Sequence, residues 1–154
     1  MNIGFLGLGK LGLPVSLAVE DKGHNIFGYD ISTQTLEDIK NKHIRYKEEW
    51  VEKFLPNTKL EINNIDDLVK NSEIIFVPIQ TPHDPKYEGI TRIPSKRIDF
   101  DYSYLKSGIK DLSEAIEKNG EDKVVIIIST VLPGTIRTEI KPLLGKHTKL
   151  CYNP

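Results

Sequence analysis

The sequence predicts an α/β protein in which a doubly wound parallel sheet forms a single domain over residues 1–154. Three observations predict this fold. Short apolar runs alternate with amphipathic stretches along the chain, which is the pattern of successive β-α units. Several of the apolar runs are continuous, as in parallel strands that helices cover on both faces. Three glycines, Gly7, Gly9 and Gly12, lie where the first apolar run meets a helical stretch. Right-handed crossovers complete the expected topology.

The first thirty residues form the most informative unit. Its parts are, in order, a strand over residues 2–6, the three glycines, a helix from residue 13, a strand over residues 25–29 and Asp30. Gly7 permits a tight turn off the first strand, and Gly9 lets the backbone approach a pyrophosphate without a Cβ atom in the way. Gly12 lets the helix pack closely on the sheet. The spacing is that of the Rossmann-like dinucleotide-binding turn.

The turn and the acid together favour NAD as the ligand. The free N–H groups and the positive dipole end of the first helix face the place of an anion. Asp30 lies where a carboxylate accepts hydrogen bonds from a ribose diol. An acid at this position repels a 2′-phosphate, so NAD is favoured over NADP. The alternative interpretation is a purely structural glycine turn without a nucleotide.

Further helices follow from apolar residues at helical spacing. We expect them over residues 31–42, 44–55, 65–70 and 102–118, and through Ile136, Ile140 and Leu143–Leu144. The candidate N-caps are short polar residues: Ser32 or Thr33, Asn63 or Asn64, and Asp99 or Asp101. Pro56 closes the second of these helices, and Asn119-Gly120 ends the fourth.

The remaining strands are expected over residues 60–62, 73–79, 124–128 and 149–152. The run 124–128 is the most apolar in the chain and predicts a fully buried strand. Cys151 lies in the last strand, where we expect it to be a small buried apolar residue.

Residues 80–100 lose this periodicity and contain three prolines and a glycine among charged residues, which indicates a long surface loop. Loops of this length inside compact domains are usually functional or mobile. This one follows a central strand, where open α/β sheets bind their ligands. Its basic residues, Arg92, Lys96 and Arg97, are interpreted as solvated charges, with a phosphate of substrate or cofactor as the alternative partner.

Two further motifs follow strands. Thr81 comes after the strand over residues 73–79, and its hydroxyl either binds a cofactor or belongs to a simple Thr-Pro turn. Thr130 follows the strand over residues 124–128, so its hydroxyl points into the crevice where a cofactor would lie. The alternative for Ser129-Thr130 is an N-cap of the helix that starts near Pro133.

Composition excludes several classes of function. The net charge of −1 predicts no nucleic-acid partner and no anionic membrane surface. The single cysteine excludes an internal disulfide, and the four histidines lack the spacing of metal ligands, so no metal site is expected. A first strand that begins at residue 2 leaves no room for a signal peptide, and no apolar run approaches membrane length. A cytoplasmic location is the resulting expectation.

Taken together, the motifs resemble the N-terminal NAD-binding domain of the UDP-glucose/GDP-mannose dehydrogenases. The resemblance covers essentially the whole chain. It rests on five blocks in order and spacing: Gly7-Leu8-Gly9-Lys10-Leu11-Gly12-Leu13-Pro14, Gly23-His24-Asn25-Ile26-Phe27-Gly28-Tyr29-Asp30, Val77-Pro78-Ile79-Gln80-Thr81-Pro82, Ser129-Thr130-Val131-Leu132-Pro133-Gly134-Thr135 and Tyr152-Asn153-Pro154.

The resemblance implies a reaction and a set of roles. Enzymes of this family oxidise C6 of a nucleotide sugar twice, from alcohol to carboxylate, with two NAD and a thioester on a cysteine. Carried onto this sequence, Gly7, Gly9 and Gly12 with the N–H groups of Lys10 and Leu11 hold the pyrophosphate, and Asp30 holds the adenosine ribose. Thr81 contacts the cofactor. Thr130 matches a threonine that helps position catalytic water near the nicotinamide, and is the one catalytic residue implied here.

The sequence also departs from the family pattern. The Asn-Pro motif of the family continues with a catalytic glutamate, whereas this sequence stops at Pro154. The family's nucleophilic cysteine, its oxyanion-stabilising lysine and asparagine and its sugar-nucleotide domain lie later still, and Cys151 does not match the nucleophile. Lys42-His43-Ile44 stands where the family often has glycine before a turn. The resemblance therefore implies a chain that binds NAD without turnover and meets a nucleotide sugar only when the missing domain is supplied.

Two other functions stay open at this stage. One is a stand-alone NAD-binding or regulatory module without chemistry. The other is the NAD domain of a β-hydroxyacid dehydrogenase-like enzyme, which shares the Gly-Leu-Gly opening but not the Tyr152-Asn153-Pro154 motif. Because the resembling family builds its dimer on a long central helix that this sequence lacks, a monomer or weak dimer is expected.

Overall fold

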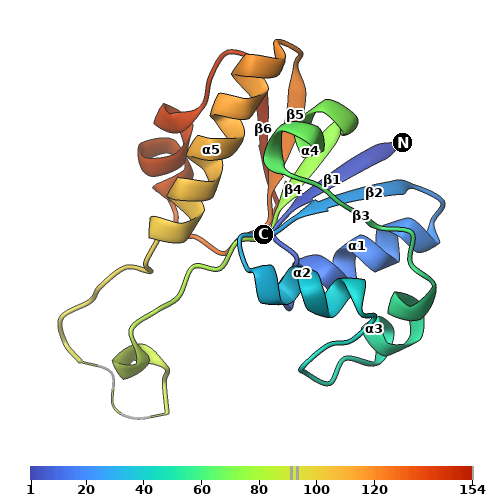
Figure 1. Cartoon of the computed structure of the whole chain (residues 1–154). Coiled ribbons are helices and arrows are strands. Elements are labelled where there is room, and N and C mark those ends of the chain that lie inside the picture. Colours follow the sequence, from blue (N-terminus) through green and yellow to red (C-terminus); the bar gives the residue numbers. More distant parts are fainter. Residues whose placement is uncertain (91, 93, 154) are drawn as a thin grey trace.

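The computed structural model describes residues 1–90, 92 and 94–153. These residues form one six-stranded sheet in the order β3-β2-β1-β4-β5-β6, in which every pair of neighbours is parallel (Figure 1). The strands are β1 (Asn2–Leu6), β2 (Asn25–Tyr29), β3 (Glu61–Ile62), β4 (Ile74–Val77), β5 (Lys123–Ile127) and β6 (Thr148–Tyr152). The chain builds outward from β1 in one direction and then from β4 in the other, so the doubly wound prediction is confirmed. The reversal lies between β1 and β4.

The helices that connect these strands are α1 (Gly12–Asp21), α2 (Thr33–Lys40), α3 (Glu49–Phe54), α4 (Ile65–Asn71) and α5 (Ser103–Asn119). Shorter 3₁₀ turns are η1 (Leu55–Asn57), η2 (Pro85–Tyr87) and η4 (Lys141–Leu143), and η3 (Ile136–Ile140) is a π-helical turn. The α5 helix ends at Gly120, whose φ of 79° places it in the left-handed region, as predicted.

Two buried clusters lie on opposite faces of the sheet because side chains alternate along a strand. On β1, Phe5 packs with the α1–α3 side, whereas Leu6 packs with the α4–α5 side. On β4 the same alternation sends Phe76 to the first cluster and Ile75 to the second. The central strands are therefore covered on both faces, as a doubly wound fold requires.

The far half of the sheet is covered on one face only, which corrects two predictions. Val125 and Ile127 of β5 are buried, but Val124 is 37% exposed and Ile126 is half-buried. Cys151 pairs in register with Ile126 and lies on the same face, so it is exposed. Both predictions of burial are wrong because the α1–α3 layer covers β1 and β2 and leaves this face of β5 and of the edge strand β6 open.

Two predicted helices are shorter than expected. The first is α2, which starts at Thr33 because Ser32 is its N-cap and accepts a hydrogen bond from the Thr35 N–H group at 3.2 Å. Ile31 therefore lies outside the helix and is exposed. The second is α3, which covers only the end of the predicted 44–55 helix, and Trp50 in it is exposed.

Of the remaining predictions for single residues and elements, some are confirmed and one is wrong. Pro56 lies inside η1, where its missing N–H group costs nothing. Asn64, one of the two candidates, caps α4 by accepting from the Asp67 N–H group. Asp101 accepts from the Ser103 N–H group at the start of α5. The predicted final helix consists of η3 and η4 instead of a regular α-helix.

Candidate functional site

The glycine turn lies at the carboxyl end of β1, at the point where the strand order reverses. Gly7 has a φ of 115°, and its N–H group donates to the Tyr29 carbonyl at 2.8 Å, which ties the turn to the end of β2. A Cβ atom on Gly12 would lie 2.1 Å from the Gly7 carbonyl oxygen and 2.8 Å from Pro78. The start of α1 therefore packs directly on the turn, and only glycine fits there.

The same turn presents backbone donors at an open surface. The first backbone hydrogen bond into the helix runs from the Leu13 N–H group to the Gly9 carbonyl, so the N–H groups of Lys10 and Leu11 precede it. Gly9, Lys10 and Leu11 are all exposed, and a Cβ atom on Gly9 would meet no heavy atom within 4 Å. An anion can therefore approach the backbone here, where the helix dipole also favours negative charge.

Asp30 is held beside this turn at the end of β2. One carboxylate oxygen accepts from the Leu8 N–H group at 2.7 Å, and the other accepts from the Ser32 N–H group at 2.8 Å. A carboxylate has about four lone-pair sites, so this arrangement fixes its orientation and leaves about two acceptor positions. They suit the two hydroxyls of a ribose.

Ile31 is a candidate contact that we did not predict. It follows Asp30 directly and is 88% exposed, and Leu11 of the glycine turn is 50% exposed. Exposed apolar side chains next to a ribose acceptor fit a planar base. The sequence held a partial signal, because Ser32 was a candidate N-cap and the residue before an N-cap lies outside the helix.

The two threonine motifs meet at the carboxyl ends of β4 and β5. The Thr81 hydroxyl donates to the Thr130 carbonyl at 2.6 Å, although 49 residues separate them. Thr81 is therefore more than part of a local Thr-Pro turn. Thr130 is exposed at this edge, and the buried Ser129 donates to the Val77 carbonyl at 3.1 Å. No side-chain hydrogen bond caps η3, so the N-cap interpretation of Ser129 is wrong.

A turn over residues 129–135, which we call the threonine turn, is held by two tyrosines. The Tyr102 oxygen accepts from the Leu132 N–H group at 3.0 Å and from the Thr135 hydroxyl at 3.4 Å, and it donates to Asp99 at 2.5 Å. Burial and the hydrogen bond to Asp99 raise the pKa of Tyr102, so the phenol stays protonated. Tyr152 contacts Val131 from the other side at 3.3 Å.

The remaining predicted features lie around this edge. Arg92, Lys96 and Arg97 are exposed on the long loop between β4 and α5, which projects away from the sheet in Figure 1. Lys42, which stands where the resembling family often has glycine, has a φ of 56°. In the Tyr152-Asn153-Pro154 motif, Asn153 donates its N–H to the Ile127 carbonyl, and Pro154 lies outside the described residues.

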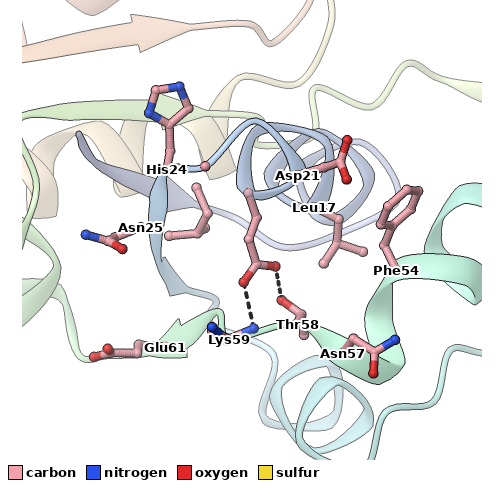
Figure 2. A pocket seen from close by; sticks show the side chains of 12 residues that line it. Leu17, Asp21, His24, Asn25, Phe54, Asn57, Thr58, Lys59 and Glu61 are labelled. Atoms are coloured by element: carbon pink, nitrogen blue, oxygen red, sulfur yellow. Dashed lines mark hydrogen bonds between the residues drawn. The ribbon is translucent and has the colours of Figure 1, made fainter.

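An open cavity of about 480 Å³ lies at the other end of the sheet, where the strands begin. Its lining includes Asn25 and Glu61, at the starts of β2 and β3, and Glu20 near the end of α1. Figure 2 shows Thr58 and Lys59 among the side chains that line this cavity. The Glu20 carboxylate accepts from the Thr58 hydroxyl and from the Lys59 N–H group, the latter at 2.6 Å. Because these acceptors are already occupied and the glycine turn is at the other end of α1, this cavity is not the nucleotide site.

The described residues contain neither a cluster of metal ligands nor a membrane-spanning helix. No group of three or more histidine, cysteine, aspartate or glutamate side chains there is arranged to hold a metal ion. No helix in the described part of the chain is long and apolar enough to cross a membrane.

Comparison with known proteins identifies the family. The model of the UDP-glucose/GDP-mannose dehydrogenase family, NAD binding domain, matches residues 1–153. Protein CapL of Staphylococcus aureus is 29% identical over 153 residues, which cover 97% of this chain and 31% of that protein. GDP-mannose 6-dehydrogenase of Pseudomonas aeruginosa is 26% identical over 149 residues, which cover 94% of this chain and 32% of the enzyme.

The solved structures agree on the fold. A ternary complex of GDP-mannose dehydrogenase from Pseudomonas aeruginosa superposes with a TM-score of 0.82 at 23% identity, over 100% of this chain and 36% of that chain. The chain thus spans about a third of the length of the relatives it matches. It belongs to the UDP-glucose/GDP-mannose dehydrogenase family and constitutes its NAD-binding domain.

Proposed function

We propose that this chain is the cofactor half of a nucleotide-sugar 6-dehydrogenase. In this proposal the glycines and the N–H groups of Lys10 and Leu11 hold the pyrophosphate of NAD, and Asp30 holds the adenosine ribose. Thr81 and Thr130 lie along the nicotinamide half. NAD supplies the hydride acceptor for oxidation of the C6 alcohol of a UDP- or GDP-sugar.

The observation that carries the proposal is the fixed carboxylate of Asp30. Backbone N–H groups on either side of it, from Leu8 and Ser32, hold both oxygens at the edge of the glycine turn. A carboxylate anchored in this way can accept from a ribose diol without first being ordered. It also opposes a 2′-phosphate by charge, which supports NAD over NADP.

Thr130 has the catalytic role in this proposal. Its carbonyl is anchored by Thr81, and the residue is exposed at the edge where β4 and β5 end. A hydroxyl there can donate to and accept from a water molecule. We assign Thr130 to holding that water near the nicotinamide, and we assign no proton transfer to it.

The length of the relatives supports assigning the other catalytic parts to a region outside the matched one. The relatives are about three times as long as the matched region, so the nucleophile and the sugar-nucleotide site belong to the part that this chain does not match. Residues 1–154 are in this proposal one NAD-binding domain, which binds NAD without turnover as a monomer or weak dimer. A nucleotide sugar becomes a ligand only when the other part is supplied.

A stand-alone NAD-binding or regulatory module is the second candidate function. The observation that favours it is that the glycine turn and the fixed Asp30 carboxylate come together within this one sheet, so the proposed site for the adenosine half needs no residue from another domain. The threonine turn argues against a stand-alone module, because a protein that catalyses no reaction does not need a threonine that positions water. The match to the family model also favours the first function over a β-hydroxyacid dehydrogenase-like enzyme.

The test is the ratio of NAD to NADP affinity in Asp30→Asn, measured by calorimetric titration. An asparagine offers one acceptor oxygen in place of two and carries no charge. We expect NAD binding to weaken about tenfold or more and the preference for NAD over NADP to shrink. A general loss of stability would weaken both ligands alike and leave the ratio unchanged.

Asp21→Asn is the matched control, since Asp21 is an exposed carboxylate at the far end of α1. It should bind both cofactors like the unmodified chain. A preference in Asp30→Asn equal to that of the unmodified chain contradicts the assignment of Asp30. Assays with UDP- and GDP-sugars complete the test, because turnover by the unaided chain would contradict the proposed division of labour.

A further inference from the structure

The long loop between β4 and α5 is closed at its base by a backbone hydrogen bond and by aromatic contacts. The Asp101 N–H group donates to the Pro82 carbonyl at 2.7 Å, so the two ends of the loop meet next to the sheet. Phe100 makes edge contacts with His83 on one side and with Tyr102 on the other, at ring separations of 6.4 and 6.3 Å. We call this group, residues 81–83 and 99–102, the loop base.

The loop base contacts the threonine turn from both of its ends. At the first end, the Thr81 hydroxyl donates to the Thr130 carbonyl at 2.6 Å. At the second end, the Tyr102 oxygen accepts from the Leu132 N–H group at 3.0 Å. The threonine turn is therefore hydrogen-bonded to two residues that flank the loop, Thr81 and Tyr102. The turn itself belongs to a different β-α connection.

Tyr102 uses its full hydrogen-bonding capacity in this arrangement. A phenol has one O–H donor and two acceptor sites. The donor goes to the Asp99 carboxylate at 2.5 Å, and the acceptors serve Leu132 and Thr135. Asp99 in turn accepts from the Phe100 N–H group with the same oxygen, at 2.7 Å. The phenol is thereby oriented by the loop base and, through its oxygen, orients the turn.

We propose that Tyr102, oriented by Asp99, is a positioning residue that sets the threonine turn for the nicotinamide half of NAD. This inference rests on the proposed function, since it takes Thr130 to lie along that half. Removal of the phenol oxygen leaves the Leu132 N–H group without its acceptor and frees the turn on one side. The adenosine half lies at the glycine turn and Asp30 in this proposal, so its binding should not be affected by this change.

The test compares NADH with ADP-ribose, which lacks the nicotinamide, in titrations of the 154-residue chain. Tyr102→Phe keeps the ring and its contact with Phe100 but removes the oxygen. We expect NADH binding to weaken by about threefold to tenfold, the range for one lost hydrogen bond, while ADP-ribose binding is unchanged. Tyr104→Phe is the control, because Tyr104 lies two residues after Tyr102, in α5, and is 53% exposed, and this variant should change neither affinity.

A second pair of variants tests the orienting role without touching the buried side of Tyr102. Asp99→Asn keeps an oxygen that can accept from the phenol, whereas Asp99→Ala removes it. Asp99 is exposed, so both variants should fold. We expect Asp99→Ala to weaken NADH binding and Asp99→Asn to restore it to near the value of the unmodified chain.

The outcomes separate this inference from the proposed function. Equal NADH affinity in Tyr102→Phe and Tyr104→Phe overturns the inference and leaves the NAD site intact. Equal weakening of NADH and ADP-ribose also overturns it, because the effect would then be global. If the unmodified chain binds neither ligand, the proposed function fails and the inference fails with it.

Discussion

Single residues at the switch point differ in what a side chain there would disturb. A Cβ atom on Gly12 would meet the Gly7 carbonyl oxygen at 2.1 Å, whereas one on Gly9 would enter open space. Gly12 is therefore required by the fold, and Gly9 only by a ligand that approaches the backbone. In the proposed site, the turn thus combines a glycine that the packing requires with one that the ligand would require, three residues apart.

Gly9→Ala and Gly12→Ala should separate these two roles. We expect Gly12→Ala to lower the free energy of unfolding by about 1–3 kcal/mol, the cost of overpacking, since the clash involves backbone. Gly9→Ala should stay within about 0.5 kcal/mol of the unmodified chain but bind NAD at least about tenfold more weakly. Urea denaturation and calorimetric titration of both variants provide the measurement. A stable Gly12→Ala or a tightly binding Gly9→Ala contradicts the assignment.

The site residues were predictable from sequence to the extent that backbone geometry defines them. The glycine turn and Asp30 lie where the spacing predicted, because each answers to a local backbone requirement. Tyr102 was not predictable, since its role depends on contacts with Leu132 and Asp99 across two connections. The exposure of Cys151 was equally hidden, because strand order, and not local sequence, decides which strand is the edge.

Among the elements, capping determines where helices begin more than apolar spacing does. The spacing predicted a helical stretch over residues 31–42 with Ser32 or Thr33 as its N-cap, and the Ser32 candidate is confirmed, because it accepts from the Thr35 N–H group and starts α2 at Thr33. Asn64 acts in the same way for α4. The predicted 44–55 helix is wrong over its first half, because residues 44–48 form no helix and follow a turn in which Lys42 has a left-handed φ. Propensity alone did not reveal this turn.

Ser32→Ala tests the cap against its rival candidate. The loss of the acceptor for the Thr35 N–H group should lower the free energy of unfolding by about 1 kcal/mol. Thr33→Ala, which alters an exposed residue one position later, should have little effect. Thermal unfolding followed by circular dichroism measures both. If the two variants are equally stable, the hydroxyl of Ser32 does not cap α2.

For the whole molecule, the sheet topology places every proposed binding residue at the carboxyl ends of the strands. The strand order reverses between β1 and β4, and the glycine turn, Thr81 and Thr130 all follow strands that end there. The alternation of apolar and helical segments predicted this topology because each β-α unit must cover a sheet face. It did not predict that one face of β5 and β6 is left open, since covering that face depends on more than the unit itself.

At the other end of the sheet, where β5 and β6 begin, an interaction should make the stability of the protein depend on acid pH. There Asp122 accepts from the His147 Nδ1 atom at 3.0 Å and pairs with Lys149 at 3.2 Å. These two interactions, that with His147 first, lower the pKa of Asp122 below its ordinary value of 3.8. Its stabilising contribution is therefore complete above that value and is lost as the pH falls through the lower pKa of the folded chain.

Asp122→Asn should accordingly be less stable than the unmodified chain near pH 6, and the difference should begin to shrink as the pH falls below about 4 and vanish below the lowered pKa of Asp122. Urea midpoints across this pH range measure the effect. Asp111→Asn, at an exposed position on α5, is the control and should run parallel to the unmodified chain. A constant difference between Asp122→Asn and the unmodified chain down to acid pH would rule out this source of acid sensitivity.

The most direct test of the central claim is a calorimetric titration of the unmodified 154-residue chain with NAD and, separately, with NADP. We predict that NAD binds in clear preference, because Asp30 accepts from the ribose diol and repels a 2′-phosphate. Equal binding of the two cofactors would contradict the role of Asp30. Binding of neither would contradict the claim that the glycine turn and Asp30 form a complete NAD site in this chain.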